Sequence, residues 1–263
     1  MSRLRAAIRG LSLGLVTGGL FAALMVGMAL LFAFRRLRLR WRGLIFRRWS
    51  KAAAWLLNVK IKTDGVPPRP PFFLVANHLS YTDIFVIASQ ADCRFVARHD
   101  LAAVPMVGWL CRGVGTIFID RSKRRDIVRV GGQVERALAE GSGVVIFPEG
   151  TSTAGATILP FKPGLLELAS RASFGVSYAA LSYRVPAGDV PAHLSVCWWG
   201  KRTFPGHLWG LLQLREVHAT LRFGREPIRA TDRKALARQL HAAVQREFIP
   251  VVNGEQECTA AIP

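Results

Sequence analysis

The sequence predicts an α/β fold: a mixed, largely parallel sheet flanked by helices, with an N-terminal membrane helix or two-helix membrane motif. Three observations predict it. Strand-like apolar runs alternate with helical periodicity. One strand–helix–strand unit, in which helix 126–140 is closed by Gly141 before strand 144–147, implies parallel pairing. Residues 11–34 contain no charged side chain, and the 263 residues are enough for one catalytic domain with a membrane segment.

The expected elements begin after a proline-rich connector at 66–71, which ends helical continuity. Apolar and β-branched runs predict strands at 72–76, 93–97, 116–119, 144–147, 176–183, 194–199 and 216–223. Helical periodicity predicts helices at 83–90, 126–140, 163–173 and 232–248. We therefore divide the chain into a membrane-anchoring part, a catalytic domain and a flexible tail, at 1–60, 61–252 and 253–263.

The N-terminal apolar stretch, residues 11–34, is long enough for a helix to cross a bilayer. Gly10, Gly14 and Gly18 form a doubled G-x-x-x-G, which allows close approach of another helix, such as the following one. Residues 35–57 mix Arg and Lys with large apolar side chains, as in a basic helix that lies among lipid headgroups. Two arrangements stay open: a true span, or a two-helix hairpin that dips into one leaflet with both ends cytoplasmic.

The net charge of +19 is concentrated near this apolar stretch. Residues 1–51 hold eleven Lys and Arg and no Asp or Glu. Nucleic-acid-binding signatures are absent, so anionic lipid headgroups are the expected partner. Eight basic residues follow the stretch and three precede it, which places the catalytic domain on the cytoplasmic side of the cell (inner) membrane. The four cysteines form no C-x-x-C pair, so neither a zinc site nor a disulfide framework is expected.

The segment from Asn77 to Asp83 directly follows the expected strand 72–76, so His78 stands at a strand end. Five steps along a continuous helix would turn Asp83 roughly 140° away from His78, so the backbone must break between them for the two to meet. If it does, Asp83 can accept a hydrogen bond from one ring nitrogen and leave the other as a base. The alternative is a solvated histidine beside an aspartate that caps the next helix.

Two further segments carry polar residues at strand ends. Phe147 to Ser152, which includes Glu149, Gly150 and Thr151, ends the strand of the clearest parallel unit. Gly115 to Arg121 ends another strand with a cation that could hold a phosphate. Turn chemistry, a solvated Glu149 and a salt bridge of Arg121 with a nearby aspartate are the alternatives. The joint occurrence of the three segments in this order favours a functional site.

These three segments resemble conserved blocks of the glycerolipid acyltransferases typified by 1-acyl-sn-glycerol-3-phosphate acyltransferase. Segments 95–98, 105–108 and 160–164 also match, and the resemblance covers roughly residues 70–185. Two departures stand out. The fourth block reads Ser177-Tyr178-Ala179-Ala180-Leu181 without a proline, which leaves the geometry of the acyl pocket open, and Arg98 replaces a common lysine.

The resemblance implies a membrane-bound O-acyltransferase that moves a fatty acyl group from acyl-CoA or acyl-carrier protein to the free hydroxyl of a lysophospholipid. The first-choice acceptor is 1-acyl-sn-glycerol-3-phosphate, which would give phosphatidic acid. His78 would be the general base, held by Asp83. Arg121, Glu149, Gly150 and Thr151 would bind the headgroup, with Arg98 and Lys162 as weaker candidates for phosphate contact. No metal or cofactor is expected.

Three alternatives remain. The acceptor could be another lyso-lipid, such as a lyso-ornithine lipid. The chain could be a non-catalytic membrane lipid-binding protein with the same fold. A serine hydrolase that uses Ser80 or Ser152 together with His78 is the third, although direct acyl transfer needs no acyl-enzyme and favours a structural role for Ser80.

Overall fold

A computed structural model describes the chain except residues 121–122, 172–173 and 253–263. A mixed sheet of seven strands forms its centre, in the order β1-β7-β6-β2-β5-β3-β4. The strands are β1 (Val59–Asp64), β2 (Phe72–Ala76), β3 (Cys93–Arg98), β4 (Ile117–Ile119), β5 (Gly143–Ile146), β6 (Val176–Arg184) and β7 (Val217–Phe223). This architecture confirms the predicted fold class.

The five strands from β6 to β4 run parallel, whereas β7 pairs antiparallel with β6 and carries β1 parallel to itself. In β2 all five side chains are buried, as expected of a central strand covered on both faces. The carboxyl ends of β2, β3, β4 and β5 therefore meet at one edge of the sheet. We call this the active edge, because the predicted site segments follow these strands.

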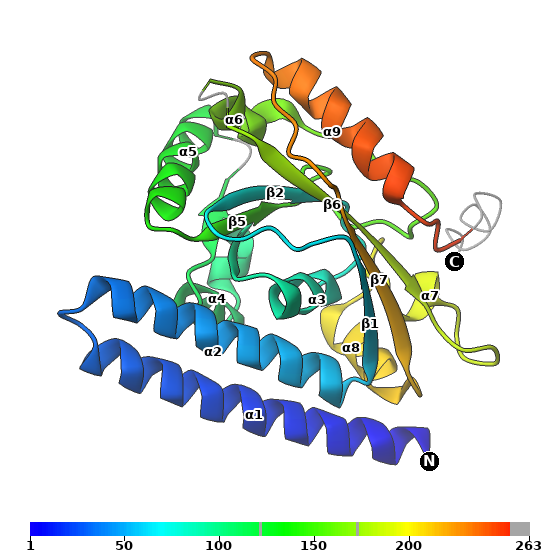
Figure 1. Ribbon diagram of the computed structural model, residues 1–263. Coiled ribbons are helices and arrows are strands. Elements are labelled where there is room, and N and C mark those ends of the chain that lie inside the picture. The colour runs from blue at the N-terminus through cyan, green and yellow to red at the C-terminus, as the bar shows by residue number, and fades with distance from the viewer. Residues whose placement is uncertain (121–122, 172–173, 253–263) are drawn as a thin grey trace.

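Helices cover both faces of the sheet (Figure 1). They are α1 (Ser2–Leu30), α2 (Arg35–Leu56), α3 (Thr82–Gln90), α4 (Val107–Gly113), α5 (Arg124–Ala139), α6 (Glu167–Arg171), α7 (Ala192–Ser195), α8 (Phe204–Gln213) and α9 (Arg233–Glu247), with short 3₁₀ helices η1 (His99–Ala103) and η2 (Pro163–Leu166). Helix α3 packs beneath α2, whereas α5 and α9 both contact η2 and α9 lies over β6. Each amphipathic helix thus buries one stripe against the sheet.

The ends of two helices follow from their sequences. Gly141 takes a φ of 79° after α5, and its N–H and that of Ser142 bind the last carbonyls of the helix, as the glycine predicted. At the start of α9, the Asp232 carboxylate accepts a hydrogen bond from the Ala235 N–H at 2.7 Å. Both signals are local, which is why the sequence reveals them.

Three elements differ from the sequence expectation. The strand expected at 194–199 is wrong: the short helix α7 ends at Ser195 and an irregular loop follows. Strand β1 was not predicted, although Val59 to Asp64 alternates apolar and polar side chains. Helix α8 was also not predicted.

Helices α1 and α2 form an antiparallel hairpin along one side of the molecule (Figure 1). Helix α1 is the one helix of the described residues that is long and apolar enough to cross a membrane. It packs along its length on α2, α8 and α4. The Arg9 guanidinium donates to the Leu214 carbonyl at 2.6 Å, and the Trp49 indole donates to the Thr17 hydroxyl at 2.9 Å. Helix α1 is therefore bonded near its N-terminus to the end of α8 and at its middle to α2.

The doubled G-x-x-x-G does not form the close approach to the following helix, α2. A Cβ added at Gly14 or Gly18 would meet no atom within 4 Å, and one at Gly10 would meet a side chain of α8. The close approach of α1 and α2 occurs instead at Gly27, where an added Cβ would lie 2.0 Å from the Trp41 indole nitrogen. The sequence motif identified small residues, but the contact is decided by which face of α1 turns toward α2.

Candidate active site

His78 and Asp83 meet at the active edge. The chain leaves β2 at Ala76 and stays irregular until α3 begins at Thr82, which supplies the break that the pair requires. The imidazole Nδ1 lies 2.7 Å from Asp83 Oδ2. The His78 side chain is 23% exposed and that of Asp83 is fully buried, so the pair presents a ring to solvent and hides its carboxylate. Nε2 is the ring nitrogen left available to a substrate.

Asp83 is held on both of its oxygens. Oδ2 also accepts the backbone N–H groups of Leu79 at 2.7 Å and Ser80 at 3.0 Å. Oδ1 accepts the Tyr183 hydroxyl at 2.7 Å. Hydrogen bonds to a buried carboxylate favour its charged form. Sequence reasoning missed Tyr183, because a tyrosine inside an apolar strand gives no signal of its partner one hundred residues away.

This geometry bears on two alternatives raised by the sequence. The Asp83 carboxylate binds N–H groups that precede α3, so it orders the loop around His78 instead of serving only as a cap of that helix. Neither serine of the hydrolase alternative engages the imidazole. Ser152 donates to the Trp198 carbonyl, and the buried Ser80 hydroxyl has no hydrogen-bond partner among the described residues.

Glu149 lies beneath the same loop and is 2% exposed. Its Oε1 accepts the His78 backbone N–H at 2.6 Å, and its Oε2 accepts the Leu159 N–H at 2.8 Å. Burial raises the pKa of Glu149 to about 7, although the two backbone N–H groups oppose this shift. Both oxygens therefore bind backbone, and Glu149 joins loop 77–81 (the catalytic loop), through His78, to segment 158–162.

The altered fourth block forms a regular part of β6, between β2 and β7. The Asn77 carboxamide bridges to it, because Oδ1 accepts the Leu181 N–H at 2.7 Å and Nδ2 donates to the Leu181 carbonyl at 3.0 Å. Leu181 and Tyr183 of one strand thus hold Asn77 and Asp83. The missing proline leaves this β6 framework unbroken.

Aromatic rings pack behind the imidazole. The Phe147 ring stacks on His78 with centroids 4.2 Å apart and planes 12° apart, and Phe95 stacks behind Phe147. On the other side of the loop, the Tyr81 hydroxyl lies 3.0 Å from His207 Nδ1, and His207 Nε2 lies 3.1 Å from the Cys197 carbonyl oxygen. The catalytic loop is therefore fixed from both sides, which limits the orientations that the imidazole can take.

The remaining predicted site residues lie around the rim. Gly150 takes a φ of 85° in a tight turn, and Thr151 is exposed beyond it. Arg98 is exposed and paired with Asp100 at 2.7 Å, whereas Lys162 is exposed beside Pro148, whose carbonyl accepts the Lys162 N–H. Arg121 lies outside the described residues. The structure thus brings His78, Asp83 and Glu149 together and leaves the side chains of Arg98 and Lys162 exposed.

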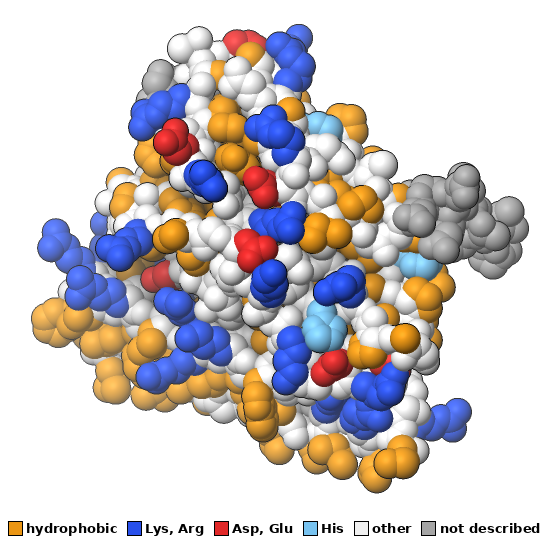
Figure 2. All heavy atoms as spheres, turned by 45° about the vertical axis from the view of Figure 1, so that its right-hand side comes forward, with side chains coloured by type: hydrophobic (Ala, Val, Ile, Leu, Met, Phe, Trp, Pro, Cys, Tyr) orange, Lys and Arg blue, Asp and Glu red, His pale blue; other side chains and the backbone are white. Residues whose placement is uncertain are grey.

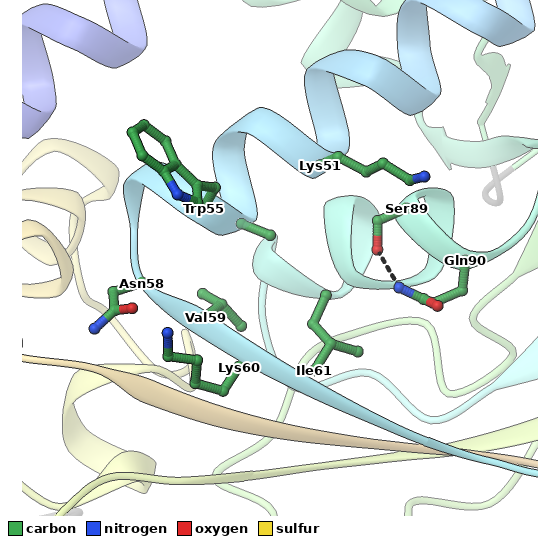
Figure 3. A pocket seen from close by; sticks show the side chains of 9 residues that line it. Lys51, Trp55, Asn58, Val59, Lys60, Ile61, Ser89 and Gln90 are labelled. Carbon is green, nitrogen blue, oxygen red and sulfur yellow. Dashed lines mark hydrogen bonds between the residues drawn. The ribbon is translucent and has the colours of Figure 1, made fainter.

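Other parts of the described chain do not offer a competing centre. No group of three or more His, Cys, Asp and Glu that could hold a metal ion occurs among the described residues. A cavity of about 270 Å³ opens between α2, β1 and the far end of α3 (Figure 3), where Lys51, Lys60 and Trp55 line it. Helix α3 separates this cavity from the catalytic loop, because Ser89 and Gln90 stand at its opposite end.

A histidine paired with a buried carboxylate at the carboxyl edge of a mostly parallel sheet is an arrangement that can supply a general base. Comparison with known proteins gives the class a name. Residues 58–191 match the acyltransferase family, and the chain belongs to this family. Its relatives include proteins named lyso-ornithine lipid O-acyltransferase and 1-acyl-sn-glycerol-3-phosphate acyltransferase. The chain is therefore an acyltransferase of the lyso-lipid type.

Individual relatives show how far the similarity extends. The chain is 33% identical to a lyso-ornithine lipid O-acyltransferase of Pseudomonas aeruginosa, over 93% of this chain and 94% of that protein. It is 30% identical to a 1-acyl-sn-glycerol-3-phosphate acyltransferase of Neisseria meningitidis, over 72% of this chain and 74% of that protein. The crystal structure of PlsC, the 1-acyl-sn-glycerophosphate acyltransferase of Thermotoga maritima, shares the fold over the whole of both chains, with a TM-score of 0.68 at 19% identity.

Proposed function

We propose that the protein transfers a fatty acyl group from a thioester to the hydroxyl of a lyso-lipid, with His78 as the general base. The observation that carries the proposal is the hydrogen bond between His78 Nδ1 and the buried, four-times bonded carboxylate of Asp83. Such a carboxylate fixes the imidazole tautomer with Nε2 free to accept a proton. It also stabilises the imidazolium that forms when the proton is taken.

The reaction follows from this arrangement. Nε2 of His78 takes the proton of the lyso-lipid hydroxyl as the oxygen attacks the thioester carbonyl carbon. The new C–O bond forms, the C–S bond breaks, and the proton on His78 passes to the leaving thiolate. No acyl-enzyme is needed, in agreement with Ser80 and Ser152 being engaged away from His78 or buried.

The acceptor proposed here is a lyso-ornithine lipid. The support is the extent of similarity: the match to the relative from Pseudomonas aeruginosa covers 93% of this chain and 94% of that protein. The relatives named for 1-acyl-sn-glycerol-3-phosphate match over less of the chain. The second candidate acceptor is 1-acyl-sn-glycerol-3-phosphate. It is favoured by segments 77–83, 115–121 and 147–152, on which the resemblance in sequence rests.

The proposed site of action is the surface of a membrane, with α1 lying in one leaflet instead of crossing it. Helix α1 packs on α2, α8 and α4, is bonded near its N-terminus to Leu214, and turns apolar side chains outward, among them Leu4, Ile8, Leu11, Leu15 and Val26. In Figure 2, hydrophobic side chains line the lower edge of the molecule, where α1 runs in Figure 1. Crossing the bilayer would require α1 to detach from α2 and α8. Orientation toward the cytoplasm stays a proposal from the charge pattern.

Replacement of His78 tests the chemistry. His78→Ala should lower kcat at least about 100-fold, because a positioned base contributes that much or more. Binding to vesicles and the melting temperature should stay near those of the wild type, since the side chain is partly exposed. Turnover of the purified variant with an acyl thioester and a lyso-lipid is the measurement. Activity within a few-fold of the wild type would remove His78 from the mechanism.

A further inference from the structure

We infer that η1 and α4 form a second membrane-binding segment, which holds the active edge at the surface of the bilayer beside α1. This contact rests on the proposed function, because it names the surface from which the lipid acceptor reaches the site. Three observations carry it: the apolar side chains that the segment exposes, the helix face that joins them to α1, and the place of the segment at the active edge.

Large apolar side chains are exposed along η1 and the start of α4. Met106 and Trp109 are each 71% exposed, and Leu101 and Val104 are exposed as well. From residue 101 to residue 119, the one charged side chain is that of Arg112. Single exposed apolar residues are common on protein surfaces, whereas a contiguous apolar patch marks a contact with a protein or a membrane. Four such residues within nine positions make a patch of this kind.

The backbone holds this patch in a fixed shape. A Cβ added at Gly108 would lie 2.3 Å from the Ala102 carbonyl oxygen, so α4 packs closely on η1. The Arg112 guanidinium donates to the same carbonyl at 2.9 Å. Met106 takes a φ of 63°, a conformation that residues with a side chain rarely adopt. The chain thus keeps a strained backbone angle at a residue whose side chain faces solvent, which indicates a use for this turn other than packing.

One face of α4 joins the patch to α1. Met106, Trp109 and Gly113 are spaced by three and four residues, so they lie on the same side of the helix. Gly113 stands against α1, since a Cβ added there would meet Phe21 and Met25. Met25 is itself an exposed apolar residue of α1. The apolar surface of α1 therefore continues onto the face of α4 that carries Trp109.

The segment also stands at the active edge. Its first part, η1, directly follows the carboxyl end of β3. On β3, the Phe95 ring stacks on Phe147, which stacks in turn on the His78 imidazole. Helix α4 packs on α1, so the segment connects the apolar helix with the edge of the sheet that carries His78. A bilayer in contact with both helices would present the hydroxyl of a lipid near the catalytic loop.

A bilayer fits this patch better than a second protein does. The patch is continuous with α1, the one helix of the described residues that is long and apolar enough to enter a membrane. The acceptor of an acyltransferase of the lyso-lipid type is itself an amphiphile. Exposed Trp and Met beside an arginine are typical of a segment that lies at the boundary between headgroups and acyl chains.

Serine substitution tests the contact. Met106→Ser/Trp109→Ser should weaken binding to phosphatidylcholine vesicles about tenfold or more, because two apolar side chains no longer transfer from water to lipid. The KM for a lyso-lipid embedded in these vesicles should rise by a similar factor. The KM for a short-chain acceptor dissolved in water should change less than twofold. The melting temperature should stay near that of the wild type, since both side chains are exposed.

Two further variants serve as controls for serine substitution. Val66→Ser/Val128→Ser removes two apolar side chains of similar exposure that lie outside α1, η1 and α4. It should bind vesicles as the wild type does. Met106→Leu/Trp109→Phe keeps apolar side chains at both positions and should bind within about twofold of the wild type.

Fluorescence quenching by brominated phosphatidylcholine reports on Trp109 directly and does not depend on turnover. Bromine on the acyl chains quenches the tryptophans that reach the hydrocarbon boundary. Trp109→Phe should still bind these vesicles, but a smaller fraction of its fluorescence should be quenched than in the wild type. Sedimentation of the lipid-free protein, with and without Met106→Ser/Trp109→Ser, shows whether the patch instead binds a second copy of the chain.

Loss of vesicle binding in the serine variant, with both control variants near the wild type, supports the contact of α4 with lipid. Unchanged binding, an equal loss in Val66→Ser/Val128→Ser, or the same quenching in Trp109→Phe overturns it. Lipid-free dimers that the serine variant abolishes, without a change in vesicle binding, also overturn it. If the wild-type protein binds vesicles through α4 but forms no ester with any lyso-lipid, the proposed function fails while the membrane contact stands.

Discussion

Tyr183 is the residue that links the catalytic carboxylate to the sheet. Its hydroxyl is buried and donates to Asp83 Oδ1, and burial together with Asp83 raises the pKa of Tyr183 well above its ordinary value, so it stays a donor. Tyr183→Phe should lower kcat roughly tenfold and move the acidic limb of the pH–rate profile to higher pH. A carboxylate that has lost one donor attracts the imidazolium more strongly.

The control for this prediction is Tyr178→Phe on the same strand, whose ring packs over Gly224. It should leave both kcat and the pH profile near the wild type. A Tyr183→Phe profile that keeps its acidic limb in place, with only a lower melting temperature, would reduce Tyr183 to a structural role.

Glu149 should make stability depend on pH near neutrality. Its pKa is about 7 in the folded protein and about 4.5 ordinarily, so between these values the folded state binds more protons than the unfolded state. The free energy of unfolding therefore falls as pH rises through this window, by at most about 3 kcal/mol from this group. Urea unfolding of the wild type and of Glu149→Gln from about pH 4 to about pH 8, which brackets the window, is the measurement. The free energy of unfolding of the wild type minus that of Glu149→Gln should fall as pH rises through the window. A value of this difference that does not change with pH would refute the raised pKa of Glu149.

Single residues also show what a sequence can reveal about a site. His78 and Asp83 stand only five residues apart, so the sequence could raise their pairing, but it left open whether the backbone breaks between them to let them meet. Glu149 was found as a residue of interest, but its partners are backbone groups of two other segments, which no motif encodes. Tyr183 reaches Asp83 only because β6 pairs with β2, a fact of the folded sheet.

At the scale of elements, the hairpin of α1 and α2 depends on one glycine. A side chain at Gly27 collides with the Trp41 indole, whereas one at Gly18 meets open space. Gly27→Leu should destabilise the protein by about 1–3 kcal/mol through overpacking. Gly18→Leu should be neutral or slightly stabilising, because leucine favours a helix more than glycine does. Thermal unfolding in detergent compares the two, and equal melting temperatures would show that α1 and α2 do not pack as described.

Elements with strong local signals were predicted, and those that depend on their neighbours were not. The central strand β2 and helices α5 and α9 follow from apolar runs, periodicity and a closing glycine. The apolar run Leu194 to Trp199 suggested a strand. In the structure its two indoles donate hydrogen bonds to nearby backbone carbonyls, and its backbone bonds to loop 77–81. Trp198 N–H, for example, donates to the Leu79 carbonyl at 2.8 Å. Such a run is buried without joining a sheet.

At the scale of the whole molecule, the two sides of the sheet are chemically different. The apolar outer face of α1 lies on one side, and α9, which carries the exposed Lys234 and Arg238, lies on the other. This arrangement suits an enzyme that draws one substrate from a lipid surface and the other from water. The sequence predicted the basic, apolar N-terminus, but not that α1 would lie packed along the body.

One measurement tests the central claim, that this fold and site acylate a lyso-lipid hydroxyl. Purified protein in phosphatidylcholine vesicles is given one acyl thioester and equal amounts of lyso-ornithine lipid and 1-acyl-sn-glycerol-3-phosphate, and the products are identified by mass spectrometry. We predict that acylated ornithine lipid predominates and that His78→Ala forms neither product. Predominant phosphatidic acid would contradict the proposed acceptor, and absence of both esters with the wild-type protein would contradict the proposed function itself.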